Sequence, residues 1–430
     1  MKRIEPIKQP LHGDITVPGD KSIAHRAVIF ASIAKGTTRI FNLSGGDDNS
    51  RTVRAFRQMG VEIARDGDAL CVAGKGWEGL HAPAAAIDCG NSGTTMRLMS
   101  GLLAGLPFHS ELDGDGSLRQ RPMQRVIDPL TQMGARIRSK SGAGLAPLEI
   151  DGGGIKGIYY PMPIASAQVK SAVLLAALQA NGTTTVVEPQ PSRNHTEVMI
   201  RGFGGSIAVD GVNITLTGGQ SLVGQEVLIP GDISSAAFFL VAAALIPGSE
   251  VTIRNVGCNP TRDGVIEVLR RMGAAIELLN ARQAAGERVA DIRVRGGKLS
   301  GIDIGPELVA RTIDEYPILS IAGAVADGVT TFADVKELRY KESDRIAAMT
   351  EGLRSLGVAV DEREDGMTIH GGGRQPFKGG AVRSFADHRV AMSFTIAGLL
   401  SAGAVEIDDT RCADISFPTF FDLLEKICLH

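Results

Sequence analysis

The sequence predicts an α/β protein of two similar domains, each made of three βαβαββ repeats. Six segments share one pattern, in which a polar cluster precedes an apolar helix-like run and a Gly-rich, β-branched strand. The segments start at Gly19, Gly90, Ser166, Gly231, Asp314 and Asp387. Their spacing of roughly 65 to 85 residues is typical of a small α/β unit and not of a short solenoid repeat. The 430 residues divide most simply into two sets of three repeats.

The first repeat begins with a helix and a strand. Ser22 is predicted to cap a buried helix that runs to about Ala34, and Lys35-Gly36 is predicted to end it. The β-branched stretch from Thr37 to Leu43 then predicts a strand.

A second helix and a hairpin complete the repeat. Asp48 or Asn49 can cap this helix, and Gly60 can end it, because glycine adopts the left-handed conformation without a Cβ penalty. The dipeptide Asp66-Gly67 predicts the hairpin turn. Equivalent glycines follow the second helices of later repeats, at Gly134, Gly205, Gly273 and Gly357.

The last repeat is cut short, because the chain ends within the helix-like run FFDLLEKI. The leading segment from Ile4 to Val17 is strand-prone and is predicted to complete it. The chain then crosses between the domains twice, and the tripeptide Pro-Gly-Asp occurs at both crossings, from Pro18 and from Pro230. A single Pro-Gly-Asp is ordinary turn chemistry, but its recurrence favours hinges. The predicted domains are residues 19–229 and residues 1–18 with 230–430.

The composition indicates a globular chain with an ample core. Hydrophobic residues make up 43% and charged residues 22%, which argues against disorder. The formal net charge of −3 argues against a nucleic-acid surface, since such surfaces are net basic. The five cysteines lack metal-ligand spacing and are predicted to be reduced thiols of a cytoplasmic protein. No apolar run predicts export or a membrane span.

Basic residues gather at the repeat openings. In GDKSIAHR, Lys21 and Ser22 lie at a predicted helix start, and Arg26 follows one turn later on the same face. A helix start attracts phosphate and carboxylate groups, although solvated surface charge is the alternative for any one cation. The P-loop spacing is absent. Further cations near the openings are Arg97, Arg119, Arg121, Lys170, Arg193, Arg339, Lys341, Arg345 and Arg389.

Two acidic positions stand apart from these cations. Asp314 and Glu315 precede the apolar run YPILSIAGAVA, and Glu342 lies in YKESDR. A carboxylate beside cations and an apolar wall can be tuned for proton transfer. The alternatives are a helix cap at Asp314 and an exposed helix acid at Glu342. The eight histidines show no ligand spacing such as HExxH, so no metal is predicted.

Eight motifs, in this order, give the chain a family resemblance. They are GDKSIAHRA, GNSGTTMRL, RQRPM, SAQVKSAVLLAAL, SRNHTE, DEYPIL, LRYKESDRI and DHRVAMSF. Together they resemble the 5-enolpyruvylshikimate-3-phosphate synthase family over essentially the whole chain. The resemblance implies two domains of three βαβαββ units, in an inverse α/β barrel-like arrangement, which close over an interdomain cleft.

The resemblance also implies a reaction. The enolpyruvyl group of phosphoenolpyruvate would be transferred to the 5-hydroxyl of shikimate 3-phosphate, with release of phosphate through a tetrahedral intermediate. This is a step of the shikimate pathway of aromatic amino-acid biosynthesis, and it uses no cofactor. The two small molecules are the implied partners of a cytoplasmic monomer that binds no nucleic acid and no membrane.

The resemblance assigns residues to each substrate. Shikimate 3-phosphate would be bound by Lys21, Ser22, Arg26, Ser166, Ala167, Gln168, Arg193, Asp314 and Lys341. Phosphoenolpyruvate would be bound by Lys21, Gly93, Arg121, Gln168, Arg345 and Arg389. Asp314 and Glu342 would transfer protons at the hydroxyl and at the methylene, and Lys21 would stabilise charge.

Two positions bear on the anion pocket. Many family members carry Lys where this chain has Ile415, and Arg411 could replace that missing cation. Gly93 stands where some members have Ala, whose methyl group crowds the inhibitor glyphosate more than phosphoenolpyruvate. Gly93 thus predicts glyphosate sensitivity. The missing Lys changes the anion pocket, so this prediction stays open until inhibition is measured.

Two alternatives remain open. The related transferase that acts on UDP-N-acetylglucosamine typically has Cys where this chain has Gly116, and Asn in place of Ser22. A non-catalytic anion-binding relative would not need Asp314, Glu342 and Lys21 together.

Overall fold

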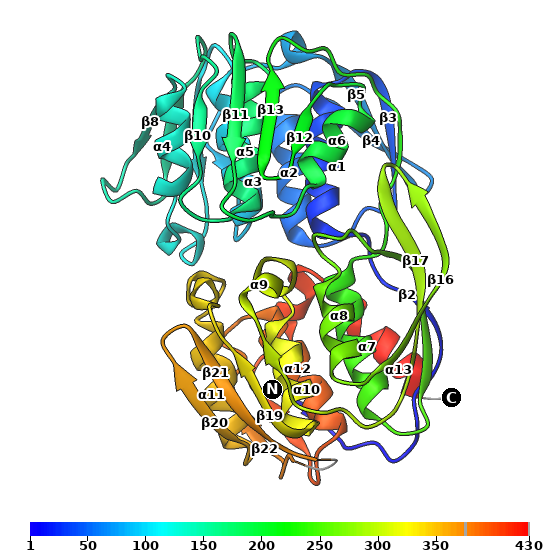
Figure 1. Ribbon diagram of the computed structural model, residues 1–430. Coiled ribbons are helices and arrows are strands. Elements are labelled where there is room, and N and C mark those ends of the chain that lie inside the picture. The colour runs from blue at the N-terminus through cyan, green and yellow to red at the C-terminus, as the bar shows by residue number, and fades with distance from the viewer. Residues whose placement is uncertain (374–375, 429–430) are drawn as a thin grey trace. The chain divides into compact units, whose positions relative to one another are not determined.

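The computed structural model describes residues 1–373 and 376–428, and Figure 1 shows its helices and strands. The chain folds into two compact units. We call residues 19–229 the N-terminal unit, and residues 1–18 with 230–430 the C-terminal unit.

The N-terminal unit contains three four-stranded sheets with strand orders β14-β3-β5-β4, β6-β7-β9-β8 and β10-β11-β13-β12. In each sheet the first two strands are parallel, and the other neighbours are antiparallel. The strands are β3 (Lys35–Phe41), β4 (Glu62–Asp66), β5 (Ala69–Lys75), β6 (Ile87–Asp88), β7 (His109–Asp113), β8 (Arg136–Ser139), β9 (Leu148–Asp151), β10 (Tyr159–Pro161), β11 (Thr183–Val187), β12 (Ala208–Asp210), β13 (Asn213–Thr217) and β14 (Glu226–Leu228).

The N-terminal unit has six α-helices. They are α1 (Lys21–Ile33), α2 (Asp47–Gln58), α3 (Gly93–Ala104), α4 (Gln124–Gln132), α5 (Ala167–Ala177) and α6 (His195–Gly202). The helices α1 to α5 contact these sheets, and α6 packs against α1. The helices α1, α3 and α5 open the three repeats and are buried over most of their lengths, because they are apolar nearly all round. They contact one another, and α5 also packs on β11 and β13 (Figure 1). The first helix of each repeat therefore lies inside, and the sheet lies outside.

The C-terminal unit repeats this plan with strand orders β16-β17-β15-β2, β18-β19-β21-β20 and β1-β23-β22. Its strands are β1 (Lys2–Ile4), β2 (His12–Thr16), β15 (Glu250–Gly257), β16 (Ala275–Ala284), β17 (Glu287–Arg295), β18 (Asp303–Ile304), β19 (Asp327–Phe332), β20 (Ala359–Arg363), β21 (Gly366–Gly372), β22 (Gly380–Val382) and β23 (Val405–Ile407). Its helices are α7 (Ile233–Leu245), α8 (Gly264–Arg271), α9 (Pro306–Thr312), α10 (Tyr316–Val325), α11 (Arg345–Ser355), α12 (His388–Leu399) and α13 (Phe420–Cys428). The helices α10 and α12 are buried along their whole lengths.

The predicted fold class, an α/β protein built from βαβαββ repeats, is confirmed. In the part of the chain that the structure describes, the strands form six separate sheets and no closed barrel.

The prediction for the leading segment was incomplete. Only β1 pairs with β23 of the last repeat, whereas β2 pairs in parallel with β15 of the fourth repeat. The segment divides because Pro6 and Pro10 lie between the two strands, and proline has no N–H to donate to a sheet.

Several predictions for local structure were wrong by a few residues. The helix α2 begins at Asp47 after Gly46, so neither Asp48 nor Asn49 caps it. Asp20 and not Ser22 caps α1, since its carboxylate accepts the N–H of Ile23 at 2.9 Å. The helix ends at Ile33, and Lys35 already belongs to β3. The first hairpin turn falls on Gly67 and Asp68, because Asp66 pairs with Ala69.

The helix-ending glycines lie where the sequence predicts them in four repeats. Gly60, Gly134, Gly273 and Gly357 have φ values of +89°, +102°, +102° and +94°. In the third repeat the residue with positive φ is Gly204 and not Gly205, because α6 ends at Gly202. The adjacent glycines offered two positions that the sequence alone did not distinguish.

No helix among residues 1–373 and 376–428 is both long and apolar enough to cross a lipid bilayer.

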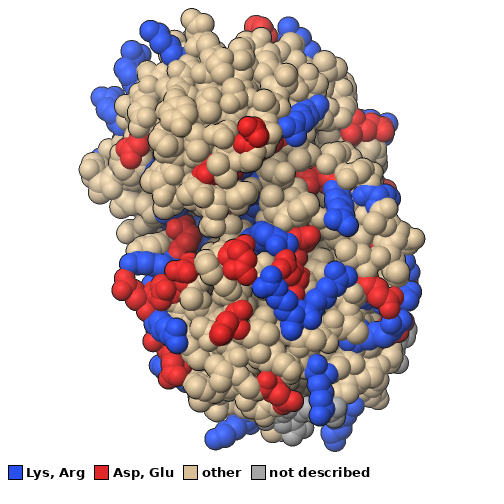
Figure 2. Space-filling view, viewed as in Figure 1, with Lys and Arg blue, Asp and Glu red and all other residues tan. Residues whose placement is uncertain are grey.

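The viewed face in Figure 2 shows acidic and basic side chains close together on the C-terminal unit. On β15, β16 and β17 they form ion pairs, such as Arg295 with Glu250 at 2.7 Å and with Glu277 at 2.6 Å.

Candidate active site

The start of α1 presents cations from the first repeat of the N-terminal unit. Lys21 Nζ donates to Asp48 Oδ2 of α2 at 2.9 Å, which fixes the ammonium group beside the helix start. Arg26 lies one turn further on and is buried. Its guanidinium donates to Ser22 O at 2.9 Å, to Thr196 Oγ1 at 2.7 Å and to Ser171 Oγ at 2.6 Å. These acceptors are neutral oxygens on α1, α5 and α6, so Arg26 joins the first and third repeats.

The start of α3 lies between two guanidinium groups. Arg97 Nη1 donates to Gln168 Oε1 at 2.6 Å, and Arg121 Nη2 donates to Asn91 Oδ1 at 2.6 Å. A Cβ atom on Gly93 would lie 3.1 Å from Arg97 Nη1 and 3.5 Å from Arg121 Nη1. The first N–H groups of α3 and the two arginines thus lie close together, which is the chemistry of an anion site.

We call Lys21, Arg26, Arg97 and Arg121 the cationic cluster. Other predicted ligands lie on the same helix starts. Ser166 caps α5 by accepting the N–H of Val169 at 3.4 Å, and Gln168 Nε2 donates to Thr94 Oγ1 at 2.9 Å. Ala167 begins α5, and the half-buried Arg193 precedes α6.

His25 lies on α1 between Lys21 and Arg26 and is fully buried. Burial lowers its pKa to about 3, although the nearby charge of Asp48 opposes this shift. Its Nδ1 forms a hydrogen bond with Thr52 Oγ1 at 2.7 Å. The imidazole is therefore neutral at neutral pH and adds no charge to the cationic cluster.

The low pKa of His25 predicts a loss of stability in acid. The unfolded chain binds a proton at His25 near its ordinary pKa of 6.5, whereas the folded chain does so only near 3. The free energy of unfolding should fall by up to about 1.4 kcal/mol per pH unit as pH drops from 6.5 towards 3. In urea titrations, His25→Gln should show a shallower decline than the wild type over this range. Parallel pH profiles would contradict the prediction.

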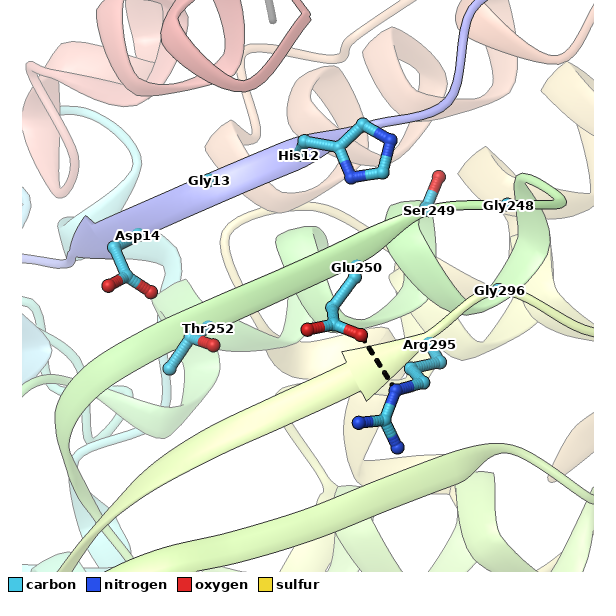
Figure 3. A pocket seen from close by; sticks show the side chains of 9 residues that line it. All are labelled: His12, Gly13, Asp14, Gly248, Ser249, Glu250, Thr252, Arg295 and Gly296. Carbon is cyan, nitrogen blue, oxygen red and sulfur yellow. Dashed lines mark hydrogen bonds and ion pairs between the residues drawn. The ribbon is translucent and has the colours of Figure 1, made fainter.

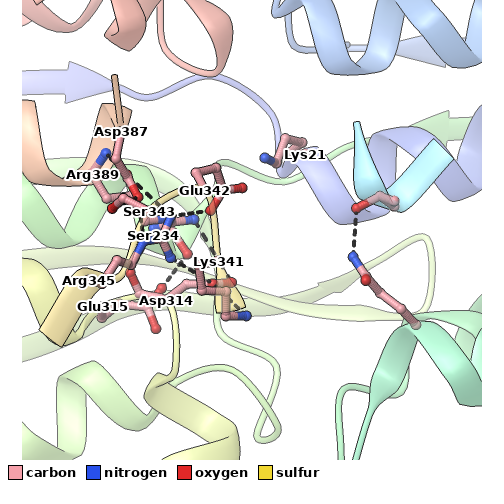
Figure 4. Close-up of polar contacts among 12 residues, drawn as sticks. Lys21, Ser234, Asp314, Glu315, Lys341, Glu342, Ser343, Arg345, Asp387 and Arg389 are labelled. Carbon is pink, nitrogen blue, oxygen red and sulfur yellow. Dashed lines mark hydrogen bonds and ion pairs between the residues drawn. The ribbon is translucent and has the colours of Figure 1, made fainter. Parts of the chain in front are cut away.

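In the C-terminal unit, Asp314 precedes α10 and is surrounded by cations (Figure 4). Its Oδ1 lies 3.6 Å from Lys341 Nζ and 3.6 Å from Arg345 Nη1, and its Oδ2 lies 3.9 Å from Arg389 Nη2. Arg389 Nη1 also donates to the Asp314 backbone O at 3.0 Å. The Asp314 side chain is 15% exposed, so the carboxylate is held by charge and still accessible.

Arg345 joins the remaining groups. Its side chain is 1% exposed and donates to Asp387 Oδ2 at 2.9 Å and to Glu342 Oε2 at 2.7 Å. Asp387 caps α12 by accepting the N–H of Arg389 at 2.9 Å, and it also accepts from Ser343 Oγ at 3.0 Å. We call Asp314, Lys341, Glu342, Arg345, Asp387 and Arg389 the mixed-charge cluster.

The buried pair at the centre of the mixed-charge cluster stays ionised. Burial alone would lower the pKa of Arg345, but the charges of Asp387, Glu342 and Asp314 raise it above its ordinary value. For Asp387 the effect of burial has the opposite sign and would raise the pKa, but the charge of Arg345 holds that pKa below its ordinary value. Glu342 therefore lies beside a permanent positive charge, with 24% of its side chain exposed.

The structure places the predicted residues in two groups. The N-terminal unit holds Lys21, Ser22, Arg26, Gly93, Arg121, Ser166, Ala167, Gln168 and Arg193. The C-terminal unit holds Asp314, Lys341, Glu342, Arg345 and Arg389. Three cations that the sequence also singled out bond to carboxylates elsewhere: Arg119 to Asp113, Arg339 to Asp344 and Glu362, and Lys170 to Glu188 and Glu197. Arg411 is 89% exposed and pairs with Asp409 at 3.3 Å.

Sequence reasoning did not predict the contacts by which several residues hold these side chains. Asp48 and Asp387 each pair with a cluster cation, and Ser234 Oγ donates to the buried Glu315 beside Asp314. Arg262 Nη2 in turn donates to Ser234 Oγ at 2.6 Å. Each is a polar residue at a helix start or the turn before one, which is the only signal that could have selected them.

An open depression of about 670 Å³ lies elsewhere in the C-terminal unit, on β2 and β15. Figure 3 shows that its lining includes His12, Asp14, Glu250 and Arg295, with Glu250 and Arg295 paired at 2.7 Å. It contains none of the predicted site residues. Across the described parts of the chain, no three His, Cys, Asp or Glu side chains are grouped so as to hold a metal ion.

Comparison with known proteins shows the family. A model for EPSP synthase (3-phosphoshikimate 1-carboxyvinyltransferase) matches residues 6–424. The chain belongs to the EPSP synthase family. The 3-phosphoshikimate 1-carboxyvinyltransferase of Geobacter metallireducens is 53% identical and covers 97% of both chains. That of Halorhodospira halophila is 54% identical and covers 97% of this chain and 94% of its own.

Solved structures agree with this assignment. An EPSP synthase from Acinetobacter baumannii is 46% identical, with a TM-score of 0.89 over 99% of this chain and 97% of its own. The family resemblance based on the eight motifs is confirmed, and the chain is a transferase.

Proposed function

We propose that this member of the EPSP synthase family transfers the enolpyruvyl group of phosphoenolpyruvate to the 5-hydroxyl of shikimate 3-phosphate and releases phosphate. The observation that carries the proposal is the mixed-charge cluster, in which Asp314 and Glu342 share the buried Arg345. A protein that only bound anions would gain nothing from two partly exposed carboxylates among its cations. The two substrates are anionic, and the cationic cluster provides the matching charge.

Shikimate 3-phosphate takes its ligands from the first and third repeats and from the mixed-charge cluster. The proposed ligands are Lys21, Ser22, Arg26, Ser166, Ala167, Gln168, Arg193, Asp314 and Lys341. Arg26 and Arg193 suit the phosphate, because a guanidinium group can donate two parallel hydrogen bonds to it. The start of α5 suits the ring hydroxyls, since Gln168 can both donate and accept.

Phosphoenolpyruvate takes Lys21, Gly93, Arg121, Gln168, Arg345 and Arg389. Gly93 has no side chain, so an anion can approach the first N–H groups of α3. The carboxylate and phosphate of this substrate each suit an arginine. Arg345 and Arg389 contribute positive charge from the C-terminal unit.

The reaction requires two proton transfers in the addition step and two in the elimination step. In the addition step, Asp314 accepts the proton of the 5-hydroxyl as its oxygen bonds to C2 of phosphoenolpyruvate, while Glu342 donates a proton to the methylene carbon. In the elimination step a methyl proton returns to Glu342 and the proton on Asp314 passes to the departing phosphate as the C2–O bond to phosphate breaks, which forms the enol ether product and returns both carboxyl groups to their starting states. Lys21 stabilises the charge of the phosphate group. Lys341 and Arg345 each lie 3.6 Å from the Asp314 carboxylate and hold it in place.

Replacement of Glu342 by Gln should abolish proton exchange at the methylene carbon. We expect kcat to fall by at least about 100-fold, because an amide cannot donate the proton. Deuterium from solvent should no longer enter the methylene group of recovered phosphoenolpyruvate, as measured by mass spectrometry. Glu351→Gln, on an exposed face of α11, is the matched control and should retain turnover and exchange. Normal exchange in Glu342→Gln would show that another group donates this proton.

Gly93→Ala should weaken inhibition by glyphosate. The added methyl carbon would lie 3.1 Å from Arg97 Nη1. Arg97 cannot move away freely, because the same Nη1 donates to Gln168 Oε1 at 2.6 Å. We expect the inhibition constant to rise by about tenfold or more, with a smaller rise in the KM for phosphoenolpyruvate. Inhibition titrations at several phosphoenolpyruvate concentrations measure both values. An unchanged inhibition constant would reject the steric argument.

We further propose that the cationic cluster and the mixed-charge cluster act on the same pair of substrates, so that the two units close when the substrates bind. Small-angle X-ray scattering with and without shikimate 3-phosphate tests this. The radius of gyration should decrease on binding, and an unchanged profile would contradict closure.

Static light scattering tests the proposed monomer, and the five free thiols fit the proposed cytoplasmic location.

A phosphate-release assay tests the reaction itself. With phosphoenolpyruvate and shikimate 3-phosphate, phosphate should appear in a one-to-one ratio with the enolpyruvyl product. With UDP-N-acetylglucosamine as acceptor, no phosphate should appear. Release with UDP-N-acetylglucosamine but not with shikimate 3-phosphate would identify the related transferase. No release with either acceptor would identify a non-catalytic relative.

A further inference from the structure

A buried ion-pair network lies behind the proposed phosphate-binding side of the N-terminal unit. Lys170 is on α5, and its side chain is 1% exposed. Its Nζ lies 2.9 Å from Glu188 Oε2 and 2.7 Å from Glu197 Oε1, and both of these side chains are 3% exposed. The reaction proposed above uses none of the three groups.

The network holds one short segment of the chain. Glu188 follows β11 and Glu197 lies in the first turn of α6, so the two carboxylates flank the segment between these elements. Lys170 Nζ also donates to Ser192 O at 3.3 Å. Glu188 Oε1 accepts from Ser192 N at 3.2 Å and from the Ser192 hydroxyl. Ser192 is thus fixed through both its backbone groups and its side chain, and the next residue is Arg193.

A second set of bonds connects this segment to Arg26. Thr196 Oγ1 accepts from Arg26 Nε at 2.7 Å and forms a hydrogen bond with Ser171 Oγ at 2.7 Å. Ser171 Oγ also lies 2.6 Å from the backbone O of Ala167 at the start of α5. Lys170 and Ser171 are adjacent on α5, so one turn of this helix connects to Arg193, Arg26 and Ala167.

Stability alone does not account for a buried lysine at this position. Burying one ammonium and two carboxylates carries a large desolvation cost, and apolar residues of similar volume often serve stability as well or better. A buried charged network is better suited to fixing a geometry, because each partner must be met at a defined place. The geometry fixed here is that of the Ser192–Arg193 turn.

We propose that Lys170 is a positioning residue for the phosphate group of shikimate 3-phosphate, acting through Arg193. The proposal rests on the function proposed above, in which Arg193 binds that phosphate. Lys170 does not touch the substrate. It holds the turn that aims the Arg193 guanidinium, while Ser171 and Thr196 hold Arg26 in register with it.

The test must remove the network without leaving unpaired buried charge. Lys170→Met alone would leave Glu188 and Glu197 facing each other in the interior and could prevent folding. The combined variant Lys170→Met, Glu188→Gln, Glu197→Gln removes all three charges at nearly constant volume. We expect its KM for shikimate 3-phosphate to rise by about tenfold, because a misplaced guanidinium loses much of a charge-assisted hydrogen bond. The kcat and the KM for phosphoenolpyruvate should stay within about twofold of the wild type.

A control variant separates positioning from loss of stability. Leu175 lies on the same helix and is buried in the core, so Leu175→Ala should lower the melting temperature by leaving a cavity. It should leave the KM for shikimate 3-phosphate unchanged. An equal rise in this KM in Leu175→Ala would show that any destabilisation of α5 has the same effect, and would overturn the proposal.

A double-mutant cycle with Arg193→Ala decides whether Lys170 acts through Arg193. Arg193→Ala should raise the KM for shikimate 3-phosphate by about 100-fold in the wild type but by only about tenfold in the combined variant. Additive effects, or a KM for phosphoenolpyruvate that rises equally, would overturn the proposal. Turnover by the wild type decides the proposed function separately, because it needs none of these variants.

Discussion

Asp314→Asn is expected to lower kcat by about 10²- to 10⁴-fold, the range typical of a lost general base. The amide is nearly the same size but cannot accept the proton of the 5-hydroxyl. Lys341, Arg345 and Arg389 all lie within 4.0 Å of the carboxylate, so the side chain should stay in place while its charge is lost. Steady-state kinetics with both substrates measure the effect, and circular dichroism verifies the fold.

The control for Asp314→Asn is Asp361→Asn, which removes an exposed carboxylate of β20 that pairs with His370 at 2.8 Å. Its kcat should equal that of the wild type. A kcat for Asp314→Asn within threefold of the wild type would exclude Asp314 as the base and leave it as a ligand of the substrate hydroxyl.

Asp387→Asn is expected to lower the free energy of unfolding by about 3–5 kcal/mol, the cost of breaking a buried ion pair from one side. Asp387 is fully buried, and its carboxylate accepts from Arg345, from Ser343 and from the N–H of Arg389. Without the negative charge, Arg345 would keep a buried positive charge with one carboxylate fewer. Chemical denaturation of both proteins measures the difference, and Asp361→Asn should be indistinguishable from the wild type.

The difference caused by Asp387→Asn should depend on pH. The charge of Arg345 holds the pKa of Asp387 below its ordinary value. Its contribution to stability is therefore complete above the ordinary pKa of an aspartate and is lost as pH falls through the lower, folded-state pKa. The stability gap between wild type and variant should narrow in acid. A gap that stays constant down to the acid transition would show that Asp387 acts through its shape as a helix cap and not through its charge.

The repeats could be predicted because each one carries its own local signals. A polar cap, an apolar run and a glycine at the helix end recur at similar spacing, and helix ends and turns depend on near neighbours. Where the prediction missed, two neighbouring residues offered the same chemistry. Asp20 and Ser22 can both cap a helix, and Gly204 and Gly205 can both end one.

The site could be predicted only in part, because pairing between distant residues is not a local property. Arg119 and Arg121 are two positions apart in one motif, yet Arg119 bonds to Asp113 and Arg121 lies near Gly93. Lys170 looks like one more anion-binding cation at a helix start. It turns inward because Glu188 and Glu197, 18 and 27 positions later, meet it in the interior. The packing of α5 against its neighbours decides this.

The pairing of the first strands sets an order in which the units can be completed during synthesis. The N-terminal unit receives its closing strand β14 at the end of its own span, so the ribosome supplies every strand of that unit in one uninterrupted stretch. The C-terminal unit is different, because β1 and β2 both precede the N-terminal unit in the chain, so that β2 waits for β15 and β1 waits for β23 of the last repeat. Until then these two strands have unpaired edges, which a nascent chain must keep from pairing with other chains.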